Sequence, residues 1–351
     1  MADTEMSGSG EGVDHGDLES CCMACAANSQ CEGFVRYMDE YSVYGTLNCD
    51  HLRIFGTLRV FSGARLYVRR ITVEASGTFV VGTPSLPAVD VLINMHHDKC
   101  VWRDNNGDCT VDGKLISYGT TRMYGQPLTS WTQLEADALP GASQIVVKAC
   151  NGWQVTDPIS IAPTASMYEP HPDLAEEFTV TTISRGEGHC TIGLSGTLLA
   201  KHLGSDSKSP GFSVHAEVLM FRRSIRITGP VHSRNDLSST YGHQGITTVQ
   251  MSPGSMQYHF VRVDNCGRIA LGQYCAHFHW ANNCPECKLV GSAFINGCNK
   301  GVTIHATQNS LLQDSVIYNV RGAGLYYENG QEMNNTALRN VSRNCVVRNS
   351  M

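Results

Sequence analysis

Short runs of alternating apolar and polar residues, separated by glycine and proline, follow one another along most of the chain. Apolar β-branched or aromatic residues alternate with polar ones in segments such as 56–60, 71–74, 77–83 and 143–147. An alternation of period two predicts strands with one buried face, and the glycines and prolines between them predict turns. No stretch shows the 3.6-residue spacing of a long amphipathic helix. The pattern therefore predicts an all-β protein.

The C-terminal third of the chain contains an internal repeat. A step of 23 residues takes Ser292, Phe294, Asn296, Val302 and His305 to Ser315, Ile317, Asn319, Leu325 and Glu328, and a step of 26 takes His279 to His305 and Leu312 to Leu338. A repeat of this length, built from short strands and Asn or Gly corners, is typical of one coil of a parallel β-helix. Leucine-rich repeats have similar lengths, but their regular leucine spacing is absent. We expect a right-handed parallel β-helix over 258–351.

The repeat also predicts columns of side chains, because residues one coil apart lie about 4.8 Å above one another. The column of Phe278, Ile304 and Tyr327 is apolar and should point into the coil. Two polar columns should share the outward face, and they consist of His277, Thr303 and Tyr326 in one and His279, His305 and Glu328 in the other.

The column of His279, His305 and Glu328 is the candidate catalytic set. Glu328 beside His305 would provide an acid–base pair, with His279 stabilising developing charge. Two imidazoles and a carboxylate could instead ligate a transition metal, or form a surface ladder of hydrogen bonds with no further role. A glycan-binding groove is the remaining alternative, and its candidate residues are His277, Trp280, Thr303, Tyr326 and Asn329.

Charge and hydropathy argue against nucleic acid as the main partner and against a membrane-spanning segment. The formal net charge of −6 argues against phosphate binding, and the basic run of Arg222, Arg223 and Arg226 is expected to decorate a strand. No apolar run approaches the roughly 18 residues that span a bilayer. The N-terminus is polar and shows no signal peptide, and the chain stops at Met351 in mid-pattern, so we expect either a piece of a longer ectodomain or an incomplete gene model.

Fifteen cysteines favour several disulfides in an oxidising compartment. Two sequons, at Asn334 and Asn340, predict glycosylation of a secreted chain. The disulfide candidates are Cys21, Cys22, Cys25, Cys31, Cys49, Cys100, Cys109, Cys266, Cys275, Cys284, Cys287 and Cys298.

Several motifs resemble known extracellular families. The run CCMACAANSQCEGF resembles part of a PAN/apple module, and 46–228 resembles a G8 domain through motifs such as Gly56-Thr57-Leu58 and Trp153-Gln154-Val155. The motifs His277-Phe278-His279, Val302-Thr303-Ile304-His305 and Tyr326-Tyr327-Glu328-Asn329-Gly330 resemble the β-helix of fibrocystin-like receptors and cell-surface hyaluronidases. We therefore expect a disordered segment at 1–18, a cysteine-rich fragment at 19–45, a G8 domain with a β-rich extension at 46–228 and the β-helix at 229–351.

The resemblance implies an extracellular protein that engages glycans or matrix. Its hyaluronidase branch implies depolymerisation of hyaluronan with calcium as the cofactor, although the residues themselves establish no cofactor. Two departures from the family remove acidic side chains, since Ala281-Asn282-Asn283 replaces a Gly-Asp and Asn329 replaces an aspartate. Because glycosidic cleavage usually needs two carboxylic acids, glycan recognition is favoured over a hyaluronidase-like activity.

Overall fold

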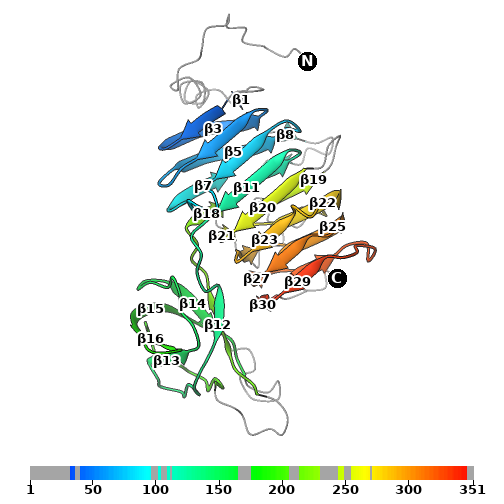
Figure 1. Cartoon of the computed structure of the whole chain (residues 1–351). Helices are drawn as coiled ribbons and strands as arrows, with labels where there is room; N and C mark the ends of the chain where they lie inside the picture. Colours follow the sequence, from blue (N-terminus) through cyan, green and yellow to red (C-terminus); the bar gives the residue numbers. More distant parts are fainter. Residues whose placement is uncertain are drawn as a thin grey trace, which may run out of the picture.

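A stack of parallel coils forms the body of the molecule (Figure 1). The computed structural model describes residues 32–35, 40–95, 102–103, 109–110, 113–164, 175–204, 213–229, 244–248, 254–268 and 271–345. Each complete coil places one strand, or half of a longer strand, on each of three faces. The described residues form strands and no helix, so the predicted all-β class and the parallel β-helix are confirmed.

The first face is an eight-stranded parallel sheet. In spatial order it contains β2 (Glu40–Val43), β4 (Thr57–Val60), β6 (Thr78–Val81), β11 (Thr120–Tyr124), β20 (Ser255–His259), β23 (Lys288–Val290), β26 (Leu311–Gln313) and β29 (Thr336–Leu338). In β4 and β6 every second side chain is buried, as the alternation in the sequence predicts.

The other two faces meet at long strands that turn a corner. The first halves of β3 (Thr46–Ile54) and β5 (Arg65–Val73) begin the second face, which continues through β7 (Val91–Met95), β18 (Ile225–Thr228), β21 (Val261–Asp264), β24 (Ala293–Gly297), β27 (Val316–Val320) and β30 (Val341–Arg343). Their second halves begin the third face, which continues through β10 (Lys114–Ser117), β19 (Gln244–Thr248), β22 (Ala276–Asn283), β25 (Val302–Gln308) and β28 (Leu325–Tyr327). β1 (Glu32–Val35) pairs with β3, and β8 (Trp102–Arg103) pairs with β9 (Cys109–Thr110).

The strand registers test the repeat directly. Phe294 pairs with Ile317 at a step of 23, and His279 pairs with His305 at a step of 26. The step from Leu312 to Leu338 is wrong, because Leu312 pairs with Ala337. Leu338 lies one position further along β29, whose three residues are all exposed, and is itself 43% exposed. The coil length therefore changes locally while the stacking is kept.

A ladder of asparagines closes one corner of four successive coils. Asn265, Asn296, Asn319 and Asn344 all have φ between 53° and 56°, a left-handed conformation that asparagine tolerates better than most residues. The Asn319 amide donates to the Asn296 side chain at 2.7 Å, and the Asn344 amide donates to Asn319 at 3.3 Å. Stacked corners thus satisfy each other's polar groups.

An antiparallel barrel is inserted into one coil, between β11 and β18. Its strands run in the order β12 (Trp131–Gln133), β17 (Glu217–Met220), β14 (Pro158–Ile161), β15 (Glu176–Arg185), β16 (Cys190–Leu194) and β13 (Gln144–Val147). A bridge between Leu134 and Val147 closes the barrel. Trp153 is among its buried residues, and the Cys150–Cys190 disulfide links two of its segments.

This insertion changes the expected domain organisation. β18 ends just before residue 229 and pairs in register with β7 on one side and β21 on the other. No break between folds therefore occurs at residue 229. The segment 46–228, expected to be a G8 domain with a β-rich extension, contains several coils of the β-helix as well as the inserted barrel.

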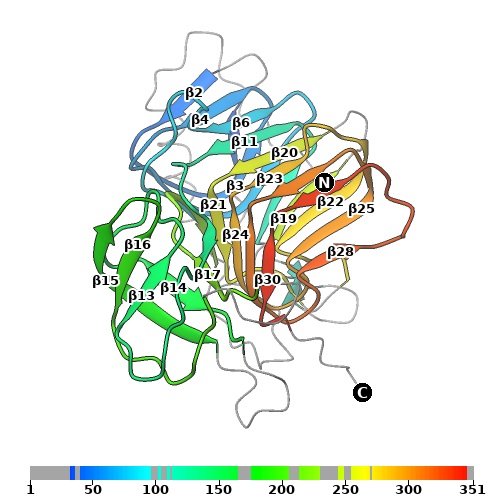
Figure 2. The ribbon, with the colours of Figure 1, turned by 60° about the horizontal axis from the view of Figure 1, so that its bottom comes forward.

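The barrel packs against the second face of the β-helix (Figure 2). Phe221 packs against Tyr318 with tilted rings whose centroids are 4.7 Å apart, and the Tyr318 hydroxyl donates to Glu177 at 2.5 Å. Arg223 is buried at this junction, donates to the Gly291 carbonyl at 2.5 Å, and has its pKa lowered to about 9 by burial and by the nearby Arg222. The expectation that Arg223 decorates a strand surface is therefore wrong, because it closes the junction instead.

Substituting Asn319 tests the corner ladder. Asn319→Ala should lower the free energy of unfolding by roughly 2–3 kcal/mol, because it loses side-chain hydrogen bonds worth about 1 kcal/mol each and places a Cβ-bearing residue without a local partner at positive φ. Asn319→Gly loses the same bonds but tolerates this φ, so it should cost about 1 kcal/mol less. Urea unfolding measures both. Equal losses would show that the left-handed conformation does not matter.

Candidate functional site

The column of His279, His305 and Glu328 forms at the end of the third face. β22, β25 and β28 lie side by side in register (Figure 2), and the Glu328 N–H donates to the Ile304 carbonyl, extending the pairing by one residue. The two Nδ1 atoms of His279 and His305 are 3.0 Å apart. A Glu328 Oε2 atom lies 3.6 Å from His305 Nδ1. The structure thus brings the three candidate catalytic residues together.

His277 joins this group from the neighbouring column. Its Nε2 is 3.7 Å from Glu328 Oε2, and its ring centroid is 4.8 Å from that of His279. Its Nδ1 lies 3.1 Å from the Gly272 carbonyl. A carbonyl only accepts, so Nδ1 carries the proton and Nε2 presents its lone pair to Glu328. His277, His279 and His305 can each direct one nitrogen into a common space, with these atoms within 4.8 Å of one another.

Two of the expected glycan contacts are not accessible. His277 is 1% exposed and Thr303 is fully buried. The aromatic ring of Tyr274 packs against His277 with centroids 4.9 Å apart, and Thr303 is held in register between His277 and Tyr326. The prediction that His277 and Thr303 share an open outward face is therefore wrong, because a loop that the repeat does not reveal covers the start of β22.

Tyr274 and Lys300 belong to the site and were missed from the sequence. The Tyr274 hydroxyl donates to Glu328 Oε1 at 3.3 Å, and the Lys300 ammonium lies 3.4 Å from that hydroxyl. Lys300 also sits over the rings of Tyr274 and Tyr326, 4.5 and 4.3 Å from their centroids. Tyr274 and Lys300 are 26 residues apart, the same step as His279 and His305. That spacing would have identified the pair.

Burial controls the charge of the two histidines on β22. The pKa of His277 is lowered to about 3, mainly by burial and then by His279, His305 and Lys300, although the hydrogen bond to the Gly272 carbonyl raises it. The pKa of His279 is lowered by burial and by His305. Both imidazoles are therefore neutral near pH 7. Within the described residues, His277 Nε2 and Glu328 Oε2 are buried and have no hydrogen-bond partner.

Glu332 is a second carboxylate near the column, but it has a structural task. Its Oε1 accepts the N–H groups of Ala306 and Asn329, both at 3.0 Å. Burial raises the pKa of Glu332, but these and other backbone N–H groups outweigh it and hold the pKa below its ordinary value. Glu332 therefore stays ionised and fixes the loop after β28. Asn329, one of the expected glycan contacts, lies exposed on this loop.

Trp280 is the aromatic residue that stands out from this face. It is 52% exposed, and its ring meets that of His305 edge-on with centroids 5.7 Å apart. A register shift between His279 and Asn282, together with the positive φ of Trp280, marks a bulge here. Bulges redirect side chains away from the regular pleat, which explains why Trp280 projects while His279 is half-buried.

The donor set does not fit the calcium that the family resemblance implied. Ca²⁺ takes six to eight oxygen ligands, whereas this cluster offers imidazole nitrogens and the single carboxylate of Glu328. Imidazole suits zinc, copper, nickel or iron instead. No step involving calcium can therefore be assigned to these residues.

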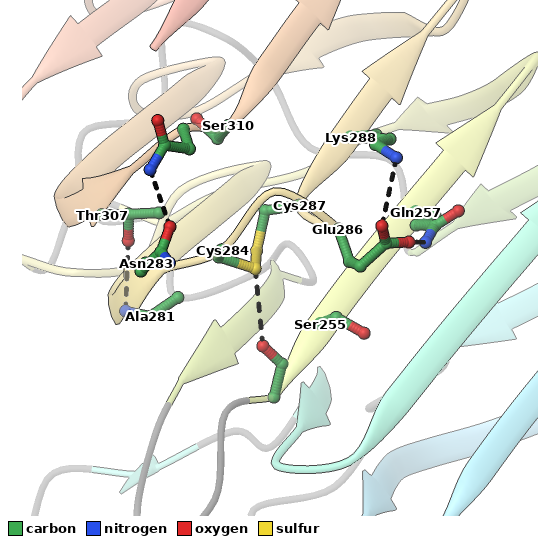
Figure 3. Close-up of a disulfide and its surroundings, with 12 residues drawn as sticks. Ser255, Gln257, Ala281, Asn283, Cys284, Glu286, Cys287, Lys288, Thr307 and Ser310 are labelled. Carbon is green, nitrogen blue, oxygen red and sulfur yellow. Dashed lines mark hydrogen bonds and ion pairs between the residues drawn. A yellow bond between two sulfur atoms is a disulfide. The ribbon is translucent and has the colours of Figure 1, made fainter. Parts of the chain in front are cut away.

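The described candidate cysteines near the site form two bridges. Cys266 pairs with Cys275 just before β22, and Cys284 pairs with Cys287 just after it (Figure 3). Cys298 is buried and belongs to neither bridge, and Cys49 is buried in the helix core. The Cys150–Cys190 bridge of the barrel was not among the candidates. Cys21, Cys22, Cys25, Cys31 and Cys100 lie outside the described residues, and so does the side chain of Cys109.

The two sequons differ in their surroundings. Asn334 is exposed, whereas the Asn340 side chain accepts from the Ser315 N–H and donates to the Leu312 carbonyl, both at 2.9 Å. The Asn340 amide therefore caps the coil below it. A glycan on that nitrogen would displace it from its half-buried position.

Glycopeptide mass spectrometry of chain secreted from a eukaryotic cell should find a glycan on Asn334 and none on Asn340. Asn334→Gln should remove the glycan without changing the melting temperature of the deglycosylated protein. Asn340→Gln should leave the glycan in place and lower the melting temperature. A glycan found on folded chain at Asn340 would contradict the capping role.

Comparison with known proteins agrees with the resemblance seen in the sequence. Residues 242–349 match the model of a family described as CEMIP beta-helix. Fibrocystin-L of Mus musculus is 24% identical over 340 residues, covering 83% of this chain and 8% of its own length. A G8 domain-containing protein of Dictyostelium discoideum is 25% identical over 292 residues, covering 79% of this chain and 23% of its own length.

The human cell surface hyaluronidase CEMIP2 is 25% identical over 251 residues, covering 66% of this chain and 17% of its own length. Among solved structures, the Gp54 tailspike of Acinetobacter baumannii bacteriophage AP22, in complex with capsular saccharide, aligns with 80% of this chain and 53% of its own at 12% identity and a TM-score of 0.23. The chain is thus similar to fibrocystin-like G8 proteins and to a cell surface hyaluronidase, as predicted, and it spans a small part of their length. The PAN/apple resemblance falls largely outside the described residues and stays a prediction.

No described segment forms a helix with the length and apolar character needed to cross a membrane.

Proposed function

We propose that this chain is an extracellular recognition module that binds acidic glycans along the third face, over the ends of β22, β25 and β28. The observation that carries the proposal is an exposed aromatic ring and a positioned cation on one rigid surface. Trp280 is 52% exposed in β22, and Lys300 lies just before β25, held over the rings of Tyr274 and Tyr326.

The spacing of these groups suits an extended chain of sugars. Lys300 stacks one coil above Tyr274. The Tyr274 ring is linked to that of Trp280 by ring contacts with His277 and His305, whose centroid separations of 4.9, 6.0 and 5.7 Å keep the two rings within about 17 Å of each other. An aromatic ring offers apolar contact to a sugar face, and the ammonium of Lys300 offers charge to a carboxylate. Tyr326, Asn329 and the half-buried His279 and His305 add polar groups along this surface.

Two further observations support an extracellular glycan as the ligand. The described residues contain three disulfides, which persist in oxidising compartments. A relative over 66% of this chain is called a cell surface hyaluronidase. Hyaluronan, which carries a carboxylate on every second sugar, is therefore the first probe.

Depolymerisation of such a glycan is the second candidate function. His305 beside Glu328 gives one acid–base pair, but glycoside hydrolysis usually needs a second carboxylic acid, and the nearby Glu332 is bound to backbone N–H groups. Incubation with hyaluronan and sizing of the products separates the two functions. Shortening that is lost in both His305→Ala and Glu328→Ala would replace the binding proposal with an enzymatic one.

Binding of hyaluronan oligosaccharides, measured by calorimetry, should be weakened at least tenfold by Trp280→Ala, a loss of about 1.4 kcal/mol. Lys300→Met keeps most of the side-chain length but removes the charge, so it should weaken binding to hyaluronan and reduce the dependence of binding on salt. Binding to a neutral glucan of equal length should change less.

Leu199→Ala provides the matched control, because Leu199 is 71% exposed on the inserted barrel. This variant should bind as the parent chain does. Hyaluronan binding that survives both Trp280→Ala and Lys300→Met would place the glycan elsewhere, and an absence of binding to every acidic glycan tested would reject the proposal.

A further inference from the structure

We propose that His277, His279, His305 and Glu328 form a binding site for a divalent transition metal of the zinc class. The four side chains come from three stacked strands, and they converge on one half-buried point beneath Trp280 and Tyr274. The site lies beneath the glycan surface and shares His279 and His305 with it, while its innermost ligand, His277, is 1% exposed.

The hydrogen bonding of His277 is that of a metal ligand. Its Nδ1–H donates to the Gly272 carbonyl at 3.1 Å, which fixes the ring and leaves Nε2 free to coordinate. Metal-bound histidines commonly donate their other ring N–H to a carbonyl in this way. Nε2 is buried, faces Glu328 Oε2, and has no hydrogen-bond partner among the described residues. A buried polar atom without a partner costs free energy, and a cation would satisfy it.

Glu328 presents the matching acceptor. Its Oε1 accepts from the Tyr274 hydroxyl at 3.3 Å, and its Oε2 has no hydrogen bond although it is buried. Oε2 lies 3.7 Å from His277 Nε2 and 3.6 Å from His305 Nδ1. Two lone-pair atoms that face each other without a proton between them leave room for a positive charge.

The separations are close to those of a tetrahedral zinc site. Zinc bonds of about 2.0–2.1 Å place neighbouring ligand atoms roughly 3.3 Å apart. The described distances of 3.0, 3.6 and 3.7 Å bracket this value, and the three histidine atoms stay within 4.8 Å of one another. Shifts of side chains by less than about one ångström would complete the coordination, with the metal replacing the proton shared by His279 and His305.

The surrounding groups select the kind of ion. Three imidazoles and one carboxylate favour zinc or a neighbouring transition metal over calcium or magnesium, which need more oxygen ligands. The backbone positions of His279 and His305 are fixed by paired strands, so the ligands are largely preorganised. The Tyr274 hydroxyl orients the Glu328 carboxylate from behind.

Zinc chloride titrated into chelator-treated full chain should bind at this site with one equivalent per chain. Cobalt(II) at the same site should give the visible absorption bands of a four-coordinate ion. His305→Ala should weaken zinc binding at least a hundredfold and abolish the cobalt spectrum, and Glu328→Gln, which keeps the volume and the packing, should weaken binding and alter the spectrum. Tyr274→Phe should weaken binding by roughly tenfold through the loss of carboxylate orientation.

His189→Ala is the matched histidine control, since His189 is exposed in a turn of the barrel. It should keep both binding and spectrum. Zinc should also raise the melting temperature of the parent chain and of His189→Ala, but not that of His305→Ala. Zinc binding that is absent, or that is equal in the parent, His305→Ala and Glu328→Gln chains, would overturn the proposal.

The metal proposal and the glycan proposal fail separately. Trp280→Ala should weaken glycan binding at least tenfold and keep the cobalt spectrum. Glycan binding is measured in chelator and zinc binding without glycan, so a negative result in one titration leaves the other intact.

Discussion

The main-chain hydrogen bonds between successive coils are the constraint on which the other features depend. They fix parallel strands at a spacing of about 4.8 Å and hold residues of consecutive coils in register, as His279 with His305. Any group placed at one position of a coil therefore meets its counterpart above and below. Asparagines become a hydrogen-bonded corner ladder, apolar residues become a continuous core, and histidines come together at contact distance.

The histidine cluster shows both the use and the cost of this arrangement. Stacking of the coils alone brings together His277, His279, His305 and Glu328. It also buries polar atoms that have no hydrogen-bond partner among the described residues. The molecule compensates on one side with Tyr274, Lys300 and the Gly272 carbonyl. The atoms that remain without a hydrogen bond, His277 Nε2 and Glu328 Oε2, face each other across the space between the imidazoles and the carboxylate.

Counting residues predicted those parts of the structure that depend on the backbone alone. The pairing of His279 with His305, and of Ile304 with Tyr327, followed from two constant steps. The same arithmetic failed for Leu338, where the coil length changes by one residue. It also failed for the burial of His277, because the register places a residue in a column but does not show whether another side chain, here that of Tyr274, covers it. The barrel was not separated from the β-helix, because its short alternating strands have the same sequence pattern as the strands of the coils on either side of it.

The position of the barrel has a consequence for how the chain folds. β11 ends at Tyr124 and β18 begins at Ile225, yet they are successive strands of one coil. Joining them through an unfolded connection of about 100 residues would carry a loop-closure cost of roughly 4 kcal/mol. A folded barrel returns its two ends to one place, where the Gln126 N–H donates to the Ser224 hydroxyl at 2.7 Å. The barrel therefore acts as a short linker once formed, and its early folding during synthesis would let the later coils stack on the earlier ones.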